Sequence, residues 1–554
     1  MSPVRAGLDR NRIISRREIE GLIAQGQLIL IVEGRVIKAD AWLPYHPGGD
    51  KAIRHMVGKD ATDEVTVLHS VEAKEKAKTF QIGRVEGIWK NFKPPIQGGR
   101  FRLPGQENGI DIQEEGTESS DASTRSSSPV FDLSGDVLVK RHTTGTSTPL
   151  SSVSSEELSA STRPSFIDAI TQKEIDFDYA KYPALDEATQ QHIIERYRIL
   201  HERIKAEGLY QCNYTAYAAE MARYTLLFSL FLITLRAGWY ATSGIFLGAT
   251  WHQLVFTAHD ACHIGITHNF QIDTGIAILI ADFIGGLSMG WWKRSHNVHH
   301  IVTNSPEHDP DIQHLPFFAV SHRFFDSLFS TYHNWILKYD SFATTMVQMQ
   351  HYLYYPILLF GRFNLYVQSW MFLAMGYSPK KGIARWHRTI EIIGQCFFWY
   401  WFGYLVVYRS IPTAWDRFSF IMLSHMITAP LHAQITLSHF AMSTADLGVH
   451  ESFPQRMLRT TMDVDCPQWL DFFHGGLQFQ AIHHLYPRIP RHNLRRTQKL
   501  VQAFCKEVDI PYALFGFVDG SKQVIGRLGE VGRQAAMLAK CQQAIVESSD
   551  YYMH

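Results

Sequence analysis

Three sets of closely spaced histidines constrain this chain more than any other feature. Members of each set lie three or four positions apart, and the sets are His259 and His263; His296, His299 and His300; and Gln480, His483 and His484. Such positions share one face of a helix, so the side chains of a set point to one place. A triple with this spacing is expected by chance roughly 0.07 times per chain. The pattern therefore favours a metal site over isolated core or surface histidines.

The number of imidazoles indicates how many metal ions they hold. The three sets contain seven histidines, which is more than the four ligands of one tetrahedral zinc. Two metal ions are the economical interpretation. Imidazole-rich ligation suits iron, copper, zinc or nickel, so spacing alone leaves the metal open.

Long apolar runs predict an all-α membrane domain between residues 166 and 500. The runs close to spanning length are 224–240, 242–258, 389–408 and 415–437. Two hairpins of spanning helices return the chain to its starting side, which places all three histidine sets on one side of the membrane. The short, glycine-rich run 275–289 is expected to be a re-entrant, in-plane or buried helix. Residues 351–375 are interrupted by polar residues and are expected at the interface.

Composition excludes several other classes. The formal net charge is zero and the sequence pI is about 7.4, so a nucleic-acid partner is not expected. The six cysteines are scattered without a framework, which indicates reduced thiols. The first residues have no apolar run, so we expect no secretory signal, and the internal segments must enter the membrane.

A small α+β domain is predicted over residues 11–90. Its strand pair lies around Glu33 and Gly34, and two histidines 23 positions apart, His46 and His69, follow. This spacing suits axial ligation of one haem iron from opposite sides. With both axial positions filled, the iron has no open site for oxygen and is left with electron transfer.

This stretch resembles cytochrome b5. The match includes His46-Pro47-Gly48-Gly49, residues 58–62, and the closing segment 80–83. The resemblance implies a haem b group held by His46 and His69. The carboxylates of this domain form either an acidic rim for a reductase or an ordinary solvated face, and they are Asp50, Asp60, Asp63 and Glu64.

Two further segments complete the expected organisation. Residues 96–165 are rich in serine, threonine and glycine, so we expect a disordered linker. Residues 501–554 are expected to form a soluble C-terminal tail without a chemical motif.

The haem domain decides between the candidate metals. Zinc has no use for electrons, whereas iron that activates oxygen does. The sequence therefore predicts a di-iron site that receives electrons from the haem, reduces dioxygen and removes hydrogen from an unactivated C–H bond. A lipid is the natural substrate for a site at the bilayer face.

The membrane domain resembles the membrane fatty-acid desaturases, and within them the front-end desaturases fused to cytochrome b5, whose third histidine box begins with glutamine as at Gln480. The resemblance implies that the seven histidines of the three sets ligate iron and that His439 is a further ligand. Gln480 is either a neutral ligand or a water anchor. Residues expected to orient the imidazoles, or alternatively to cap helices and turns, are Asp260, Asn304, Asp309 and Asp311.

Residues 291–300 and 304–317 resemble the delta-8 sphingolipid desaturases of fungi and plants. The resemblance implies a trans double bond between carbons 8 and 9 of the long-chain base of ceramide. It also implies an NADH-cytochrome b5 reductase as electron donor. The expected location is the endoplasmic reticulum membrane, with the haem domain and the histidine sets on the cytosolic side. Lys293, Arg294 and the basic residues of 488–496 either bind lipid head groups or form an ordinary basic rim.

Three alternatives remain open on the sequence. One is a delta-6-type acyl-lipid front-end desaturase, and another is a lipid hydroxylase, because the same oxidant can return oxygen to the substrate. The third is a membrane-tethered haem electron carrier that is not an enzyme.

Overall fold

The computed structural model describes residues 9–101, 131–132 and 165–552. The expected disordered linker at 96–165 lies for the most part outside these ranges. In chain order the α-helices and strands are α1 (Arg16–Ala24), β1 (Ile29–Val32), β2 (Arg35–Lys38), α2 (Asp50–Arg54), α3 (Thr62–Leu68), α4 (Val71–Lys78), β3 (Gln81–Arg84), β4 (Arg100–Phe101), β5 (Phe131–Asp132), α6 (Phe166–Lys181), α7 (Glu187–Ala206), α8 (Tyr214–Arg236), α9 (Tyr240–Cys262), α10 (Phe270–Ile278), α11 (Met289–Ile301), β6 (Phe329–Ser330), β7 (Trp335–Ile336), α12 (Ser341–Leu358), α13 (Gly361–Met375), α14 (His387–Phe398), α15 (Ala414–Met426), α16 (Ala429–Phe440), α17 (Phe453–Thr460), β8 (Asp463–Asp465), α18 (Asp471–His474), α19 (Gln480–Leu485), α20 (Leu494–Glu507), β9 (Leu514–Gly516) and α21 (Phe517–Tyr552).

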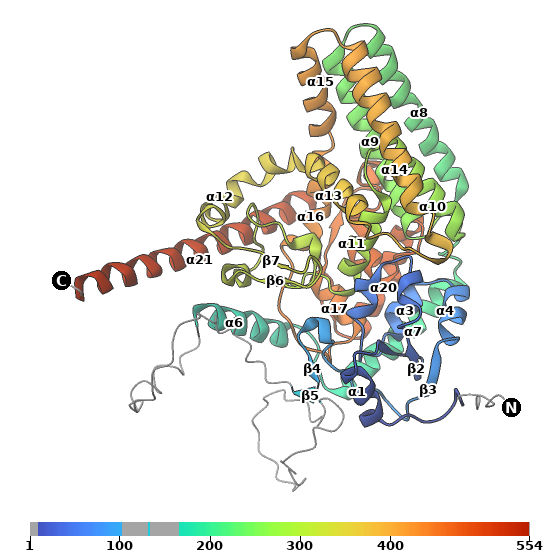
Figure 1. Cartoon of the computed structure of the whole chain (residues 1–554), viewed down its shortest axis with the longest axis vertical. Helices are drawn as coiled ribbons and strands as arrows, with labels where there is room; N and C mark the ends of the chain where they lie inside the picture. The colour runs from blue at the N-terminus through green and yellow to red at the C-terminus, as the bar shows by residue number, and fades with distance from the viewer. Residues whose placement is uncertain (1–8, 102–130, 133–164, 553–554) are drawn as a thin grey trace, which may run out of the picture.

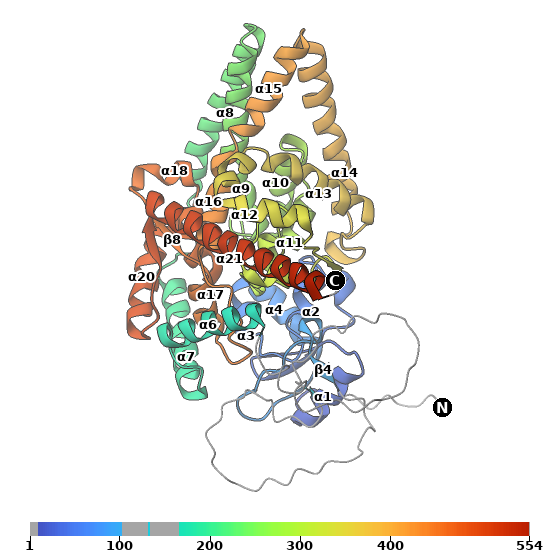
Figure 2. The same cartoon turned by 90° about the vertical axis from the view of Figure 1, so that its left-hand side faces the viewer.

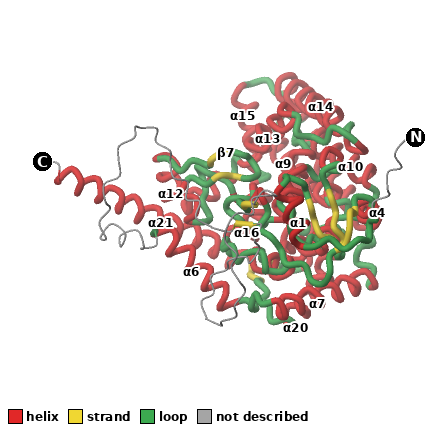
Figure 3. The backbone as a smooth tube through the Cα atoms, turned by 60° about the horizontal axis from the view of Figure 1, so that its bottom comes forward, coloured by secondary structure: helices red, strands yellow, loops and turns green. Residues whose placement is uncertain are grey.

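The N-terminal domain is built on an antiparallel sheet of order β1-β2-β3. Glu33 and Gly34 join β1 to β2 with φ of 51° and 68°. Two successive left-handed residues match the right-handed twist of a tight hairpin, so the expected strand pair forms here. Helices α1 to α4 surround the sheet, which Figure 3 shows in yellow beside α4.

The core of this domain continues into the rest of the chain. Val298, Ile301 and Val302, at the C-terminal end of α11, are buried in the same cluster as Ile29 and Met56 of the N-terminal domain. The face of α11 that carries these residues therefore packs against the N-terminal domain. The opposite face is left for His296, His299 and His300.

Helices α8, α9, α14 and α15 extend together away from the N-terminal domain (Figure 1). Among the described residues, two helices are long and apolar enough to cross a membrane, Tyr214–Arg236 and Gly382–Ser410. The second comprises α14 and the π-helix η7 (Trp399–Ser410) that follows it. Residues Phe270–Ile284 and Met289–Ile301 pass the same test only as a pair bent by 118°, which is either a broken span or a re-entrant loop.

The expected spans differ from the helices in two places. The run 224–240 lies in a helix that starts earlier, where the Asn213 side chain caps the N-terminus, and ends at Arg236, two residues before Gly238 with φ of 80°. The run 415–437 is not one helix but two, α15 and α16, interrupted at Ile427–Thr428. Pro430 explains this break, because proline lacks the N–H of a helix interior and is tolerated in a first turn.

The C-terminal residues pack against the membrane domain. Helix α20 runs through the expected domain boundary at position 501, and β9 pairs in parallel with β8. Val524, Leu528 and Val531 of α21 are buried with Val347 of α12 and Leu437 of α16. Residues 511–535 therefore contribute to the core that surrounds α16.

Candidate metal centres

Four helices bring the predicted ligands together from distant parts of the chain. His259 lies in the last turn of α9, and His263 caps its C-terminus. Helix α11 begins at Met289, where the Ser288 side chain caps its N-terminus, and carries three histidines. The short helix α19 carries His483 and His484, and α16 ends one residue after His439.

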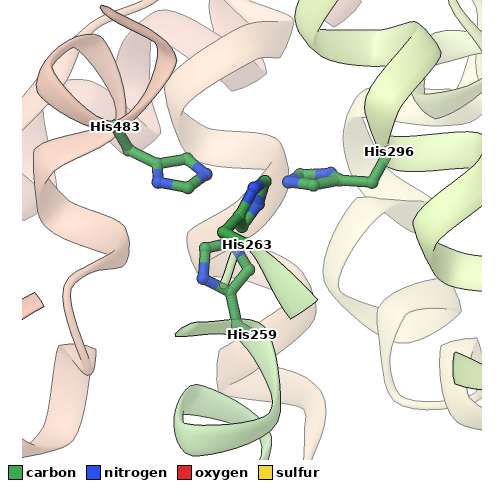
Figure 4. A group of neighbouring side chains, drawn as sticks. All are labelled: His259, His263, His296 and His483. Atoms are coloured by element: carbon green, nitrogen blue, oxygen red, sulfur yellow. The ribbon is translucent and has the colours of Figure 1, made fainter. Parts of the chain in front are cut away.

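The first cluster joins all three histidine sets. One ring nitrogen from each of its four members lies within 4.8 Å of the others, and the members are His259, His263, His296 and His483. Figure 4 shows these rings directed toward one another, His259 and His263 from the end of α9, His296 from α11 and His483 from α19. His263, His296 and His483 are buried or nearly so.

The second cluster brings His299 and His484 together with His439 under the same 4.8 Å limit. His439 is fully packed, and its ring centroid lies 4.6 Å from that of His299 and 5.0 Å from that of His484. His300 lies between the clusters. Its Nε2 is 3.1 Å from the Nε2 atoms of both His296 and His483, and its ring stacks on His484 at 4.3 Å.

These distances fit metal coordination. Two nitrogens bound at right angles to one metal, each at roughly 2.1 Å, are separated by about 3 Å. The Nε2 atoms of His299 and His484 are 3.2 Å apart, and those of His300 and His296 are 3.1 Å apart. The two clusters thus have the donor type and spacing that two imidazole-bound metals require.

Several buried ring nitrogens at the site have no hydrogen-bond partner among the described residues. They are His263 Nε2, His300 Nδ1 and His439 Nδ1. A buried polar atom without a partner costs about 1–3 kcal/mol, so each calls for an explanation. A metal held by the first cluster would give His263 Nε2 a partner, whereas His300 faces the clusters with its Nε2 and not with its Nδ1.

Neighbouring groups orient the rings as expected for metal ligands. His299 Nδ1 donates to Asp309 Oδ2 at 2.8 Å, which leaves its Nε2 lone pair facing the second cluster. The Thr303 hydroxyl is 3.3 Å from His484 Nδ1 and donates to the His299 carbonyl. The Asn304 amide donates to the His439 carbonyl at 2.9 Å. The sequence pattern assigned no role to Thr303.

The remaining candidates of the sequence take different positions. Asp311 lies 3.5 Å from His296 Nδ1 and accepts a hydrogen bond from Ser295. Gln480 is buried one turn before His483 on α19; whether it binds metal stays a prediction. Trp292, which the spacing did not single out, stacks on His296 with centroids 4.2 Å apart.

Asp260 is held by a buried arginine. Its Oδ2 accepts from Arg491 at 2.5 Å and from the Tyr217 hydroxyl, and Arg491 also pairs with Glu220. The expectation that residues 488–496 form a basic rim or contact head groups is therefore wrong for Arg491, which is 6% exposed. A sequence does not reveal that one arginine of a basic cluster points inward to fix α8 and α9.

The N-terminal domain holds a second candidate site. The His46 and His69 rings have centroids 6.0 Å apart. An iron bound on opposite sides at roughly 2 Å from each nitrogen would place two imidazole centroids about 6 Å apart. His46 Nδ1 donates to the Gly49 carbonyl at 2.7 Å and His69 Nδ1 to the Val65 carbonyl at 3.1 Å.

Because a carbonyl only accepts, both imidazoles carry their proton on Nδ1 and leave Nε2 free. Burial, together with the nearby His46, lowers the pKa of His69 to about 3, so this ring is neutral at physiological pH. The pair therefore fits the axial positions of a haem.

The acidic surface of this domain faces arginines of the same chain. Asp63 accepts from Arg198 at 2.8 Å and 3.3 Å, and Glu64 accepts from Arg456 at 3.2 Å. Both carboxylates are less than 9% exposed. A third pair joins Asp50 to Arg294 of α11 at 3.1 Å. In this arrangement Asp63 and Glu64, expected to belong to a solvated face or a reductase surface, are covered, whereas the Asp50 side chain stays 38% exposed and Asp60 is only partly buried.

Comparison with known proteins follows the same division of the chain. Residues 237–516 match the fatty acid desaturase family, and residues 15–86 match the cytochrome b5-like haem/steroid binding domain. A protein of Emericella nidulans named delta 8-(E)-sphingolipid desaturase is 60% identical over 98% of this chain and 99% of its own length. The chain belongs to the fatty acid desaturase family.

Other desaturases extend the comparison. A protein of Kluyveromyces lactis with the same name is 49% identical over 98% of this chain and 97% of its own length. A delta(8)-fatty-acid desaturase of Helianthus annuus is 37% identical over 53% of this chain and 62% of its own length. The family resemblance seen in the sequence is confirmed. This desaturase is an oxygen-dependent oxidoreductase with a fused haem-binding domain. The family membership argues against the alternative that the protein is only a haem electron carrier and not an enzyme.

Proposed function

We propose that the chain is a delta-8 (E)-sphingolipid desaturase, which introduces a trans double bond between carbons 8 and 9 of the long-chain base of ceramide. The full-length identity of 60% to a protein of that name carries this assignment. The convergence of seven histidines and His439 on two adjacent clusters supports the chemistry it requires.

The residues of the two clusters would hold two irons, and His46 and His69 would hold haem b. Bound there, the irons supply the reduction of dioxygen and the removal of hydrogen from an unactivated C–H bond. The protein contributes the orientation of the His299 and His484 rings through Asp309 and Thr303, and Asn304 holds the backbone carbonyl of His439. His439 is proposed as a ligand because it lies in the second cluster. Gln480 is proposed as a ligand or water anchor because it is buried on the same short helix as His483.

Helix α11 connects the residues that would hold the haem with those that would hold the irons. A Cβ placed on Gly48, next to the haem-ligand loop, would lie 2.6 Å from Asn297 Nδ2 and 2.9 Å from the His46 ring. Asn297 is the immediate neighbour of His296. One helix therefore contacts the haem domain on one face and presents three ligands on the other.

An NADH-cytochrome b5 reductase is the proposed source of these electrons. The carboxylates that such a partner would recognise are paired with Arg198, Arg456 and Arg294 in the docked arrangement. The haem domain would therefore have to separate from the membrane domain for such a partner to reach Asp63 and Glu64.

The proposed membrane arrangement has four spans, α8, α9, α14 with η7, and α15. The contacts of α9 with both α8 and α15, and of α15 with η7, support it, although α9 carries polar residues and α15 is short. All clusters then lie on the cytosolic side of the endoplasmic reticulum membrane. The domain boundaries proposed are 11–90 for the haem domain and 166–500 for the desaturase domain; residues 511–535 of the expected tail, 501–554, add to the core of the desaturase domain.

Expression in a yeast that lacks this activity tests the function. Long-chain bases with two hydrogens fewer, bearing a trans bond at C8, are expected. Unsaturated fatty acids with unchanged long-chain bases would favour the delta-6 acyl-lipid alternative, and a gain of one oxygen would favour the hydroxylase.

A further inference from the structure

A second layer of polar side chains lies two helical turns from the proposed iron ligands. His252 precedes His259 by seven residues on α9, and His432 precedes His439 by seven residues on α16. Seven residues return to the same face of a helix after about 10 Å along its axis. Each of the two helices thus carries a second histidine about 10 Å along its axis from its proposed iron ligand.

His252 presents a buried donor without a partner. It is 4% exposed, and its Nδ1 faces the amide nitrogen of Gln253 at 3.2 Å. The orientation of that amide is set by Arg223, which donates to its oxygen, and by the Phe472 carbonyl, which accepts from its nitrogen. His252 Nδ1 therefore accepts, and the proton must be on Nε2, which has no partner among the described residues.

Gln434 and His474 extend this layer. The Gln434 amide is 3% exposed, and its nitrogen lies 3.2 Å from His474 Nδ1. Its oxygen is buried and, like the Nε2 of His432, lacks a partner within the described part of the chain. We call the four side chains His252, His432, Gln434 and His474 the polar layer. It combines unpaired donors and acceptors on the membrane side of the metal clusters.

An exposed aromatic surface lies beside the polar layer. Trp469 is 71%, Phe472 44% and Phe473 36% exposed, and Phe473 stacks on His252 at 5.1 Å. These residues belong to α18 and the turn before it, near the lower end of α8 in Figure 2. Arg223 of α8 lies over the Phe472 ring at 4.9 Å. Aromatic rings beside an arginine are typical of the boundary between the hydrocarbon core and the head groups.

We propose that the polar layer binds the amide and hydroxyl groups at the head of the long-chain base. The inference rests on the proposed function and specifies how the substrate is positioned. An extended chain advances about 1.2 Å per bond, so the oxygen on C1, eight bonds from C8, lies about 10 Å from it. This length equals the separation of the polar layer from the ligand histidines. Selection of C8 then follows from measuring a fixed length from the head group.

A competition experiment on the full-length protein tests this proposal. Membranes containing each variant receive ceramide and a ceramide whose long-chain base lacks the C1 hydroxyl, and the ratio of the two desaturated products is measured. We expect His252→Phe and Gln434→Leu each to lower the preference for the hydroxylated substrate about tenfold, the worth of one hydrogen bond. His252→Gln keeps a donor near Nε2 and is expected to retain the preference.

Matched measurements separate the outcomes. His351→Leu removes a histidine with an unpaired ring nitrogen on α12, outside the polar layer, and is expected to change nothing. The iron-to-haem ratio of each variant shows whether the metal clusters are intact. An unchanged product ratio in both layer variants, or equal losses on both substrates with full iron content, would overturn the proposal. If the unaltered protein introduces no double bond at C8, the result contradicts the proposed function itself and not the role of the polar layer.

Discussion

The ion pairs between the haem domain and the membrane domain predict that replacing one carboxylate by an uncharged amide slows electron delivery. Glu64 and Arg456 form an ion pair whose side chains are 7% and 16% exposed, and buried Lys59 lies beside them. In Glu64→Gln the cations of Lys59 and Arg456 face each other without a carboxylate between them. A hydrogen bond between charged groups contributes about 1.5–3 kcal/mol, so the docking constant is expected to fall about 10- to 100-fold.

The assay follows reoxidation of the reduced haem after mixing with oxygen and lipid substrate, at several salt concentrations. We expect the haem of Glu64→Gln to be reoxidised more slowly than the haem of the unaltered protein. The slowing is expected to begin at a lower salt concentration in the variant. Glu75→Gln serves as the control, because Glu75 is exposed and pairs only locally with Lys78. The exchanged pair Glu64→Arg with Arg456→Glu is expected to recover part of the rate. Equal slowing in the control, or no slowing at any salt concentration, would refute the docked arrangement as the electron-delivering state.

Four further substitutions test three separate parts of the structure. His46→Ala or His69→Ala is expected to abolish the Soret absorption while leaving non-haem iron in place, and retention of haem in both would contradict axial ligation. Asp309→Ala removes the acceptor of the His299 ring and is expected to weaken iron binding 10- to 100-fold in a chelator titration; unchanged affinity would contradict its orienting role. Arg459→Met leaves the carboxylates of its buried partners unpaired and is expected to cost about 3–5 kcal/mol of stability, measured as earlier thermal unfolding. An unaltered unfolding temperature would show that this pairing contributes little.

The sequence was most informative where neighbouring residues share a helix. The spacing of His296, His299 and His300 predicts a common face, and the structure has them on one face of α11. Spacing cannot show which sets meet, because that depends on packing between α9, α11 and α19. His439 has no periodic partner, and only the family resemblance singled it out.

Other features depend on long-range contacts that no local pattern encodes. The inward position of Arg491 follows from its pairing with Asp260 and Glu220, which lie more than 200 residues earlier. The pairing of Glu64 with Arg456 joins residues 392 positions apart. The break between α15 and α16 was within reach of the sequence, since Pro430 is visible there, but hydropathy outweighed it in the expectation of one span.

The iron-to-haem ratio of the purified full-length protein tests the central claim most directly. Two histidine clusters that each hold one iron, beside a haem held by His46 and His69, predict three irons for each haem. A ratio of one iron per haem in active protein would contradict the proposed di-iron site.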